Sequence, residues 1–192
     1  ETQFELMDLQ QELGMTFLIV THDQEEAMTV ADRIAVMDHG KLIQVAGPSE
    51  IYEQPNSRYV ADFIGDINIV EGRVTAIDGG LIRMEAAAPR VSIVMEDDAA
   101  TSVGATAWMA VRPEKVRISH DAPIETGVNA VHGEVWDIGY IGDTSVYHVK
   151  LDDGGTFRAA VANVSRTVER PIGWDDRVWL TWSKTAGVVL TA

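Results

Sequence analysis

The sequence contains no cysteine among its 192 residues. This absence excludes disulfides, cysteine-ligated zinc, iron–sulfur clusters and catalysis by a thiol, and it fits the reducing cytoplasm. Basic residues are also scarce, because 15 lysines and arginines face 30 aspartates and glutamates, for a net charge of −15. Phosphate backbones and anionic lipids are bound through Lys and Arg. The charge therefore argues against nucleic acid and against a polybasic membrane contact.

Long hydrophobic runs are missing as well. The longest clean run near the start, Met15–Val20, is far shorter than the roughly 20 residues that a membrane-spanning helix needs. The first residues are rich in glutamate and not in lysine or arginine, so they predict no secretion signal. With 46% hydrophobic and 23% charged residues, the composition is that of a folded globular protein.

The chain divides into two regions that differ in charge and in pattern. Residues 1–66 hold 13 of the 30 acidic and 3 of the 15 basic residues, and their pattern mixes helices and strands. Residues 67–192 are less acidic and are predicted to be almost all strand. We place the boundary near Gly65-Asp66. Because the first residue is Glu1 and not methionine, we expect a processed chain or a piece of a longer protein.

The first region predicts an α/β arrangement. Apolar residues at helical spacing predict a helix over 1–13, ended by a glycine. Met15–Val20 is continuously apolar, as in a strand that is buried on both faces of a parallel sheet. Asp23 and Glu26 have the spacing of a capping box, which predicts a second helix.

The remainder of this region predicts a β-hairpin over 33–46 and short helices over 48–53 and 58–64. Strands that alternate with helices belong to a sheet covered by helices. One buried strand and one hairpin cannot form such a sheet, so partner strands must come from earlier in a longer chain or from another copy. We therefore expect self-association as a two-fold dimer that covers Met15–Val20.

The second region contains a repeat. The pattern Asn-x-Val-x-Gly-x-Val-x-x-Ile occurs over 68–77 and again over 129–138. Each half ends in two apolar strands that we expect to pair, namely 107–111 with 116–118, and 178–182 with 188–191. Short strands with Gly and Asp turns are typical of a barrel or sandwich. Two similar halves predict one β-barrel or two packed barrels.

His22 is the first candidate for chemistry. It follows the predicted buried strand at its carboxyl end, where ligands bind in α/β sheets, and it precedes a helix N-terminus, which favours phosphate. An imidazole there can hydrogen-bond a phosphate oxygen or a water that attacks it. The alternatives are a histidine that only caps or packs, and a metal site formed with Asp23. Adjacent residues point apart and no second histidine has ligand spacing, which weakens the metal alternative.

The other polar and aromatic candidates favour structural roles. We expect His120 and His132 on the surface and a solvated turn over Arg112–Arg117. The five tryptophans fit the core and rim of a barrel better than a stacking platform for bases. No Ser-His-Asp arrangement, paired-carboxylate site, dinucleotide-binding glycine motif or G-x-x-x-x-G-K-[ST] phosphate loop is recognisable.

The sequence around His22 resembles a known family. The residues that carry the resemblance are Val20-Thr21-His22-Asp23-Gln24-Glu25-Glu26-Ala27-Met28, Ala31-Asp32-Arg33-Ile34-Ala35-Val36-Met37, Gly40-Lys41, Gln44, Gly47-Pro48, Ile51-Tyr52 and Pro55. They are similar to the last third of the nucleotide-binding domain of ABC importers for polyamines, sugars and oxyanions.

The second region resembles the regulatory TOBE β-domain of the same subunits. The matching segments are Phe63–Asn68 at the junction, Val111–Val116 with its Arg-Pro-Glu element, and Tyr140–Val149 and Val188–Thr191, which look most like polyamine importers. The implied architecture is part of a nucleotide-binding domain over 1–66, with a remnant of its parallel sheet, followed by an all-β OB-like TOBE barrel over 67–192.

The resemblance implies an ATP-hydrolysing subunit that drives polyamine uptake. Such a subunit binds ATP and Mg²⁺ as a dimer with a second ATP-binding subunit on the cytoplasmic face of the bacterial plasma membrane. Its partners are transmembrane permease subunits and, indirectly, a periplasmic polyamine-binding protein. His22 matches the switch histidine, which contacts the γ-phosphate and helps position the attacking water. Thr21, Asp23 and Glu26 match the residues that support it.

The phosphate loop, the magnesium carboxylate, the catalytic glutamate and the signature sequence of that family would all precede Glu1. We therefore expect the 192-residue chain to bind neither ATP nor a metal by itself and to be inactive. Two further hypotheses stay open: a stand-alone small-molecule-binding β-domain that acts as a sensor, and a metal-dependent phosphohydrolase that uses His22 and Asp23.

Overall fold

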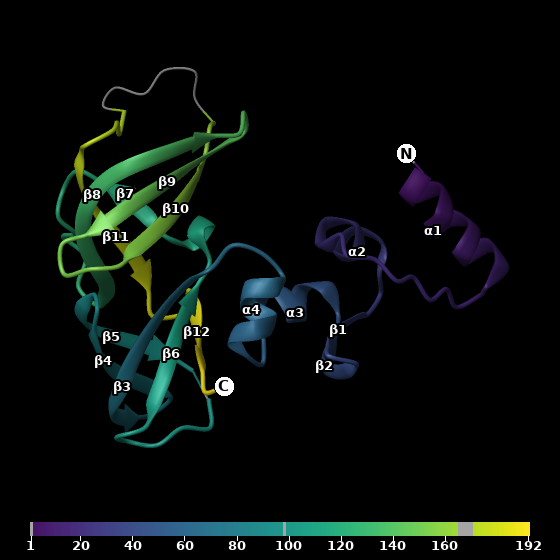
Figure 1. Cartoon of the computed structure of the whole chain (residues 1–192), viewed down its shortest axis with the longest axis horizontal. Helices are drawn as coiled ribbons and strands as arrows, with labels where there is room; N and C mark the ends of the chain where they lie inside the picture. Colours follow the sequence, from purple (N-terminus) through teal and green to yellow (C-terminus); the bar gives the residue numbers. More distant parts are fainter. Residues whose placement is uncertain (1, 98, 165–170) are drawn as a thin grey trace. The chain divides into compact units, whose positions relative to one another are not determined.

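The computed structural model describes residues 2–97, 99–164 and 171–192 (Figure 1). Backbone contacts divide the chain into two units, Glu1–Gly65 and Asp66–Ala192. Each unit has a hydrophobic core of its own. Strands take up 46% of the chain and helices 17%, so the fold as a whole is mostly β.

The described part of the first unit contains helices and one β-hairpin. Its elements are α1 (Thr2–Leu13), α2 (Gln24–Val30), β1 (Ile34–Asp38), β2 (Lys41–Ala46), α3 (Pro48–Glu53) and α4 (Arg58–Phe63). α1 ends at Gly14, whose φ of +60° suits a residue without a Cβ atom. α4 begins after Ser57, whose hydroxyl accepts a hydrogen bond from the Val60 N–H. Local signals of this kind explain why the predicted helices form.

The predicted hairpin over 33–46 is confirmed, because β1 and β2 pair antiparallel. The turn residues His39 and Gly40 have positive φ angles of 46° and 77°, as two-residue hairpin turns require. The core of the first unit joins this hairpin to the α3–α4 region. It consists of Ile34, Val36, Ala46, Ile51, Val60 and Ile64.

Met15–Val20 is not a strand, so the prediction of a buried parallel strand is wrong for this structure. The side chains of Leu18 and Val20 are 94% and 93% exposed. No described strand lies beside the segment to form a ladder. A segment without strand partners gains neither ladder hydrogen bonds nor a buried face. The one sheet described in the first unit is the antiparallel hairpin.

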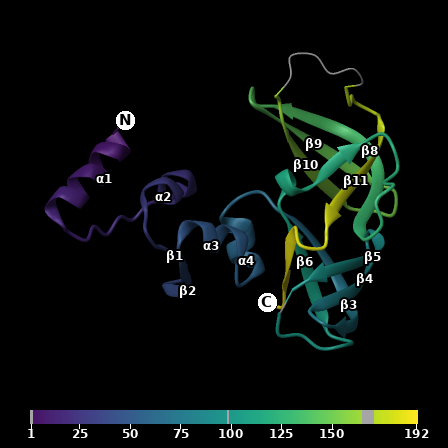
Figure 2. The same cartoon turned by 180° about the vertical axis from the view of Figure 1, so that it is seen from behind.

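The described part of the second unit forms two antiparallel sheets (Figures 1 and 2). The first sheet has the strand order β12-β6-β3-β4-β5, and the second has the order β10-β9-β8-β11-β7. Side chains from both sheets form one core, in which the rings of Phe157 and Trp182 stack with centroids 5.1 Å apart. The elements are β3 (Asn68–Asp78), β4 (Leu81–Ala87), β5 (Arg90–Glu96), β6 (Thr106–Val111), the 3₁₀ turn η1 (Pro113–Lys115), β7 (Arg117–Ser119), β8 (Val128–Tyr140), β9 (Thr144–Leu151), β10 (Thr156–Ala162), β11 (Arg177–Ser183) and β12 (Gly187–Leu190).

The repeated motif occupies equivalent places in the two sheets. β3 carries the first copy and pairs with β4, and β8 carries the second copy and pairs with β9. Both ladders shift register just after the second valine of the motif, Val74 or Val135. At Gly72 and Gly133 a Cβ atom would press against the backbone of the neighbouring strand, which explains the glycine in both copies.

The last strand of each half crosses into the sheet of the other half. The predicted pairing of 107–111 with 116–118, and of 178–182 with 188–191, is therefore wrong. β6 pairs instead with β3 and β12, and β11 pairs with β8 and β7. Pro113 begins η1, where the chain leaves one sheet for the other. Each sheet is thus completed by a strand from the other half of the repeat.

The predicted barrel is not closed, because in the described residues neither sheet pairs its two edge strands. At the edges of the first sheet, the Glu96 N–H donates to the Lys184 carbonyl at 2.8 Å, and the Val189 N–H donates to Asp97 Oδ2 at 2.7 Å. These bonds run between loop and strand residues and satisfy edge groups without a ladder. The structure therefore has two curled sheets over a common core.

Candidate functional site

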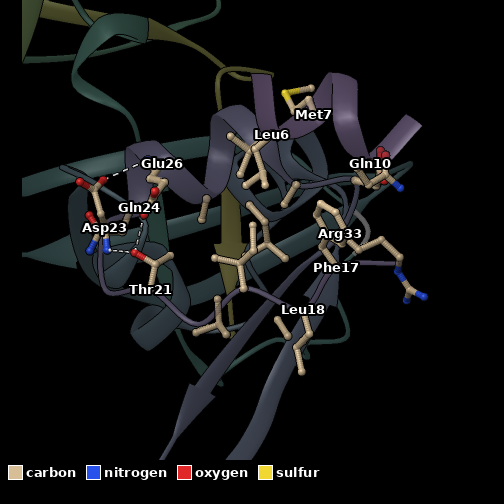
Figure 3. A pocket seen from close by; sticks show the side chains of 18 of the residues that line it. Leu6, Met7, Gln10, Phe17, Leu18, Thr21, Asp23, Gln24, Glu26 and Arg33 are labelled. Carbon is tan, nitrogen blue, oxygen red and sulfur yellow. Dashed lines mark hydrogen bonds between the residues drawn. The ribbon is translucent and has the colours of Figure 1, made fainter. Parts of the chain in front are cut away.

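The candidate site lies in the first unit, in the loop that leads from Met15–Val20 into α2. Three hydrogen bonds fix this loop (Figure 3). The Thr21 hydroxyl donates to Glu26 Oε2 at 2.9 Å, and it accepts from the Asp23 N–H at 3.0 Å. The Glu26 N–H donates to Asp23 Oδ1, also at 3.0 Å. Three of the four predicted site residues are thus brought together.

Of the two hydrogen bonds in the predicted capping box, the one from the Glu26 N–H to the Asp23 side chain is formed. Asp23 caps α2 by accepting from the N–H of Glu26, as expected. The Glu26 carboxylate accepts from the Thr21 hydroxyl, and the Asp23 N–H donates to that same hydroxyl. Thr21 therefore lies between the two partners and connects the segment before the loop to the first turn of the helix.

His22 is exposed at this loop and lines a cavity of about 450 Å³. The cavity is also lined by residues of α1, the 16–19 segment, α2 and β1. Figure 3 shows apolar side chains, among them Leu6, Phe17 and Leu18, beside the polar group of Thr21, Asp23 and Glu26. His22 is therefore on an open surface and not sealed inside the first unit.

The loop offers hydrogen-bonding chemistry but no phosphate cradle. An exposed imidazole can donate to or accept from a phosphate oxygen or a water. The described residues around it provide three carboxylates, Asp23, Glu25 and Glu26, which repel an anion. The cap also occupies an N–H of α2 that an anion would otherwise use. Nucleotide phosphates therefore do not fit this loop without further cationic groups.

Metal binding has little geometric support at this site. Nowhere in the described residues do three or more His, Asp or Glu side chains gather in a way that could hold a metal ion. His22 and Asp23 are adjacent in the chain, and Asp23 is engaged as the cap of α2.

His120 and His132, which we predicted to lie on the surface, are partly buried and paired with carboxylates. His120 Nε2 lies 3.0 Å from Asp176 Oδ2, and its side chain is only 15% exposed. His132 Nδ1 lies 2.7 Å from Asp152 Oδ2. The pKa of Asp152 is lowered, chiefly by this hydrogen bond and further by Arg177, although partial burial opposes the shift.

The prediction of a solvated turn over Arg112–Arg117 is wrong for Arg112 and Pro113, which are buried. Arg112 is only 3% exposed, and its Nη1 donates to the Asp66 carbonyl at 3.1 Å. A residue 46 positions earlier in the chain binds the guanidinium, so no local pattern could reveal the contact.

The tryptophans divide between core and rim, as expected. Trp182 is buried in the core, whereas Trp136 and Trp174 are exposed. The Lys150 ammonium lies 5.1 Å from the centre of a Trp136 ring, and the Trp108 indole donates to Glu71 Oε2 at 3.0 Å. Trp136 and Trp108 thus have different partners.

Asn68 and Asn129 stabilise the fold through side-chain hydrogen bonds that we did not predict from the sequence. The Asn68 side chain accepts from the N–H of Arg158 at 2.7 Å and donates to its carbonyl at 2.8 Å. The Asn129 side chain bonds the backbone of Val94 in the same way, at 2.8 and 2.9 Å. Their identical position at the start of each repeat was the signal that could have found them.

Among the helices of the described residues, none combines the length and the apolar character that spanning a bilayer requires.

The second unit contains a TOBE domain, since residues 109–190 match that family. The fold agrees with this. A solved structure of the cytoplasmic molybdate-binding protein ModG superimposes with a TM-score of 0.55, at 14% identity, and covers 71% of this chain and 97% of that chain. At this identity the likeness concerns the fold alone.

Over almost its whole length the chain is a homologue of polyamine import ATP-binding proteins. The putrescine transport ATP-binding protein PotG of Escherichia coli is 39% identical over 189 residues, which are 98% of this chain and 50% of the relative. A spermidine/putrescine import ATP-binding protein PotA of Rubrobacter xylanophilus is 42% identical over 92% of this chain and 48% of the relative. The chain spans about half the length of the curated relatives it matches.

Proposed function

We propose that this chain is part of the ATP-hydrolysing subunit that energises polyamine uptake by an ABC importer, with putrescine or spermidine as cargo. The supporting observation is an exposed histidine in a loop fixed by hydrogen bonds, within a chain homologous to polyamine import ATP-binding proteins.

His22 is the proposed chemical residue. In this role its imidazole hydrogen-bonds the terminal phosphate of ATP or the water that attacks it. Thr21, Asp23 and Glu26 act as positioning residues, because their mutual hydrogen bonds fix the backbone on both sides of His22.

ATP and Mg²⁺ need groups beyond those described here. The sequence has no phosphate loop, and the described residues offer no set of three metal-ligating side chains. Bound ATP would supply the phosphoryl group and Mg²⁺ would balance its charge. Under this proposal the chain contributes one histidine to a composite site and is inactive by itself.

The proposed surroundings follow from the same assignment. The subunit would lie on the cytoplasmic face of the bacterial plasma membrane, against permease subunits and a second ATP-binding subunit. A periplasmic polyamine-binding protein would deliver the cargo to the permease. The TOBE unit would regulate the subunit and contribute to contacts between the two copies. Nucleic acid is not a proposed partner, because the net charge is −15.

The other two hypotheses are less well supported. The relatives are named as ATP-binding import proteins, which gives no support to a stand-alone sensor. A metal-dependent phosphohydrolase would need at least three ligands gathered around His22 and Asp23, and in the described residues no three such side chains come together there.

The experiment is His22→Ala in the full-length subunit assembled with its permease. We expect ATP affinity to stay within about twofold, while the ATP turnover rate falls on the order of 10²-fold or more, because a group that positions the reacting water is lost. Equilibrium binding and steady-state turnover separate the two effects.

The matched control is His39→Asn, which removes an exposed histidine from the hairpin turn of the same unit and keeps a residue that tolerates positive φ. Its turnover should equal that of the unsubstituted subunit. Unchanged turnover in His22→Ala would contradict the proposal, and loss of a bound metal ion in that variant would favour the phosphohydrolase.

A further inference from the structure

Two buried polar residues stand at core-facing positions of the TOBE unit. Asn68 begins β3 and Asn129 lies near the start of β8, and both residues are only 4% exposed. In the alternation of their strands they share the inward face with Val70 and Val131. A buried amide destabilises a protein unless it is hydrogen-bonded. Each asparagine therefore needs partners inside the unit.

Each asparagine has its partners on the opposite sheet. Asn68 belongs to the first sheet. Its Oδ1 accepts from the Arg158 N–H of β10 at 2.7 Å, and its Nδ2 donates to the Arg158 carbonyl at 2.8 Å. Asn129 belongs to the second sheet, and it makes the same two bonds with Val94 of β5, at 2.8 and 2.9 Å. The contacts between the two sheets are thus reciprocal.

Both partners lie on edge strands. β10 is an edge of the second sheet, and β5 is an edge of the first. In an antiparallel ladder, a hydrogen-bonded residue exchanges both its N–H and its C=O with one residue on the neighbouring strand. The asparagine amide makes this pair of bonds with Arg158 or Val94, so a side chain takes the place of a strand. Groups that an edge would leave open are thereby satisfied.

The surroundings of the two contacts differ. Where β3 meets β10, which we call the β3–β10 seam, the Arg158 guanidinium also donates to Asp66 Oδ1 at 2.5 Å and to the Ile67 carbonyl at 3.1 Å. Where β8 meets β5, the β8–β5 seam, the Asn129 amide also lies 3.8 Å from the sulfur of Met95, a weak acceptor. The asparagine bonds occur at both seams, because both copies of the repeated motif begin with this residue.

We propose that Asn68 and Asn129 act as two latches that hold the sheets of the TOBE unit together, each controlling the opening of one seam. Each latch consists of two neutral hydrogen bonds to a single residue, so it can break without unfolding the sheets. A broken latch exposes the N–H and carbonyl of an edge strand, the part of a sheet that pairs with other strands. The latches thus allow local opening and protect two edges. This inference does not depend on the proposed ATPase role.

The test removes one latch at a time in the 192-residue chain, as Asn68→Ala and Asn129→Ala. Amide hydrogen exchange by NMR follows the N–H groups of Arg158 and Val94, because these are the donors that each latch binds. We expect Asn68→Ala to speed exchange at Arg158 about tenfold or more and to leave Val94 within about twofold. Asn129→Ala should do the reverse.

The matched control is Asn163→Ala. It also removes two side-chain amide bonds, one from the Ser145 hydroxyl and one to the Gly142 carbonyl, but these lie within the second sheet and its β8–β9 turn. Exchange at Arg158 and Val94 should stay unchanged in this variant.

Global unfolding has to be separated from local opening. The amides of Met109 and Leu180 report global unfolding, because both residues are buried and lie on the inner strands β6 and β11. A latch variant should speed exchange at its own partner much more than at these two residues. An equal increase at all of them would overturn the proposal, since the asparagines would then stabilise the unit only as a whole.

The unsubstituted chain gives a second measurement that does not require any variant to fold. Exchange is followed at rising urea concentrations below the unfolding transition. Opening of a seam exposes little surface and so depends weakly on urea, whereas global unfolding depends strongly on it. We expect the weak dependence at Arg158 and Val94 and the strong dependence at Met109 and Leu180. A strong dependence at all four amides would contradict the latches.

Discussion

Thr21, Asp23 and Glu26 bind one another and leave the neighbouring His22 on the surface of a cavity. Each of these residues has a local reason for its place. Asp23 caps a helix that starts at the next residue, and Glu26 lies one turn further on. The side chain that chemistry would use is thus positioned by neighbours that stabilise the loop.

Asp152 provides a test at the scale of one residue. Its carboxylate is bound by His132 and by Arg177, and its pKa is lowered for this reason, with His132 as the main cause. We expect His132→Ala to raise the pKa of Asp152 toward the ordinary value of about 3.9. A carboxyl-detected NMR titration measures the change, and Asp175, which is exposed, serves as an internal reference.

The direction of the pKa shift of Asp152 decides at which pH its carboxylate stabilises the folded protein. A carboxylate with a lowered pKa in the folded state stabilises the protein above its unfolded pKa, and the contribution is lost as the pH falls through the folded pKa. Asp152→Asn should therefore reduce the free energy of unfolding at pH 7 and leave it nearly unchanged at pH 2. An identical loss at both pH values would contradict the assignment.

What could be predicted at this scale depends on how far apart the interacting residues are. The cap formed by Asp23 lies within one helical turn and was found from the sequence. The burial of Arg112 depends on the Asp66 carbonyl, and the pairing of His120 depends on Asp176, 56 residues away. Contacts of this length leave no local signature.

At the scale of elements, the distance between partners in the sequence again explains the outcome. The β1–β2 hairpin forms as predicted, whereas Met15–Val20 does not form a strand. The hairpin is closed by its own turn residues, and its strands are adjacent in sequence. A parallel strand needs partners from distant segments, and the described residues contain none for Met15–Val20. The apolar pattern of that segment is real, but the described residues supply no strand that would bury it.

The exposure of Met15–Val20 leads to a prediction of self-association. Burial of apolar surface favours contact between copies, so we expect a dimer by multi-angle light scattering at high micromolar concentration. Leu18→Ser with Val20→Ser should weaken this association at least tenfold. The control is Ile124→Ser, which removes a 96% exposed apolar side chain from the second unit. A clean monomer of the unsubstituted chain at that concentration would count against the prediction.

The strand order of the second unit was harder to predict from the sequence than its repeat and its turns. The repeat, the alternation of buried residues along β3 and the Gly/Asp turns follow from the sequence. The exchange of β7 and β12 between the sheets does not follow from the sequence, because the apolar alternation of a strand shows which of its faces is buried but not which strand it pairs with.

At the scale of the whole molecule, the exchange makes the two halves of the TOBE unit interdependent, because each sheet needs a strand from the other half. The first unit has a core of its own but also exposes apolar segments. The molecule thus combines a β-unit with a shared core and a smaller unit that exposes apolar side chains.

We propose that this chain contributes a histidine to a nucleotide site that it does not complete. The most direct measurement is the ATP affinity of the 192-residue chain, by isothermal titration calorimetry with Mg²⁺, beside that of the full-length subunit. We predict saturable binding to the full-length subunit and none to the chain up to about 1 mM, where the binding free energy is about −4 kcal/mol. A dissociation constant in the micromolar range for the chain alone would contradict the account.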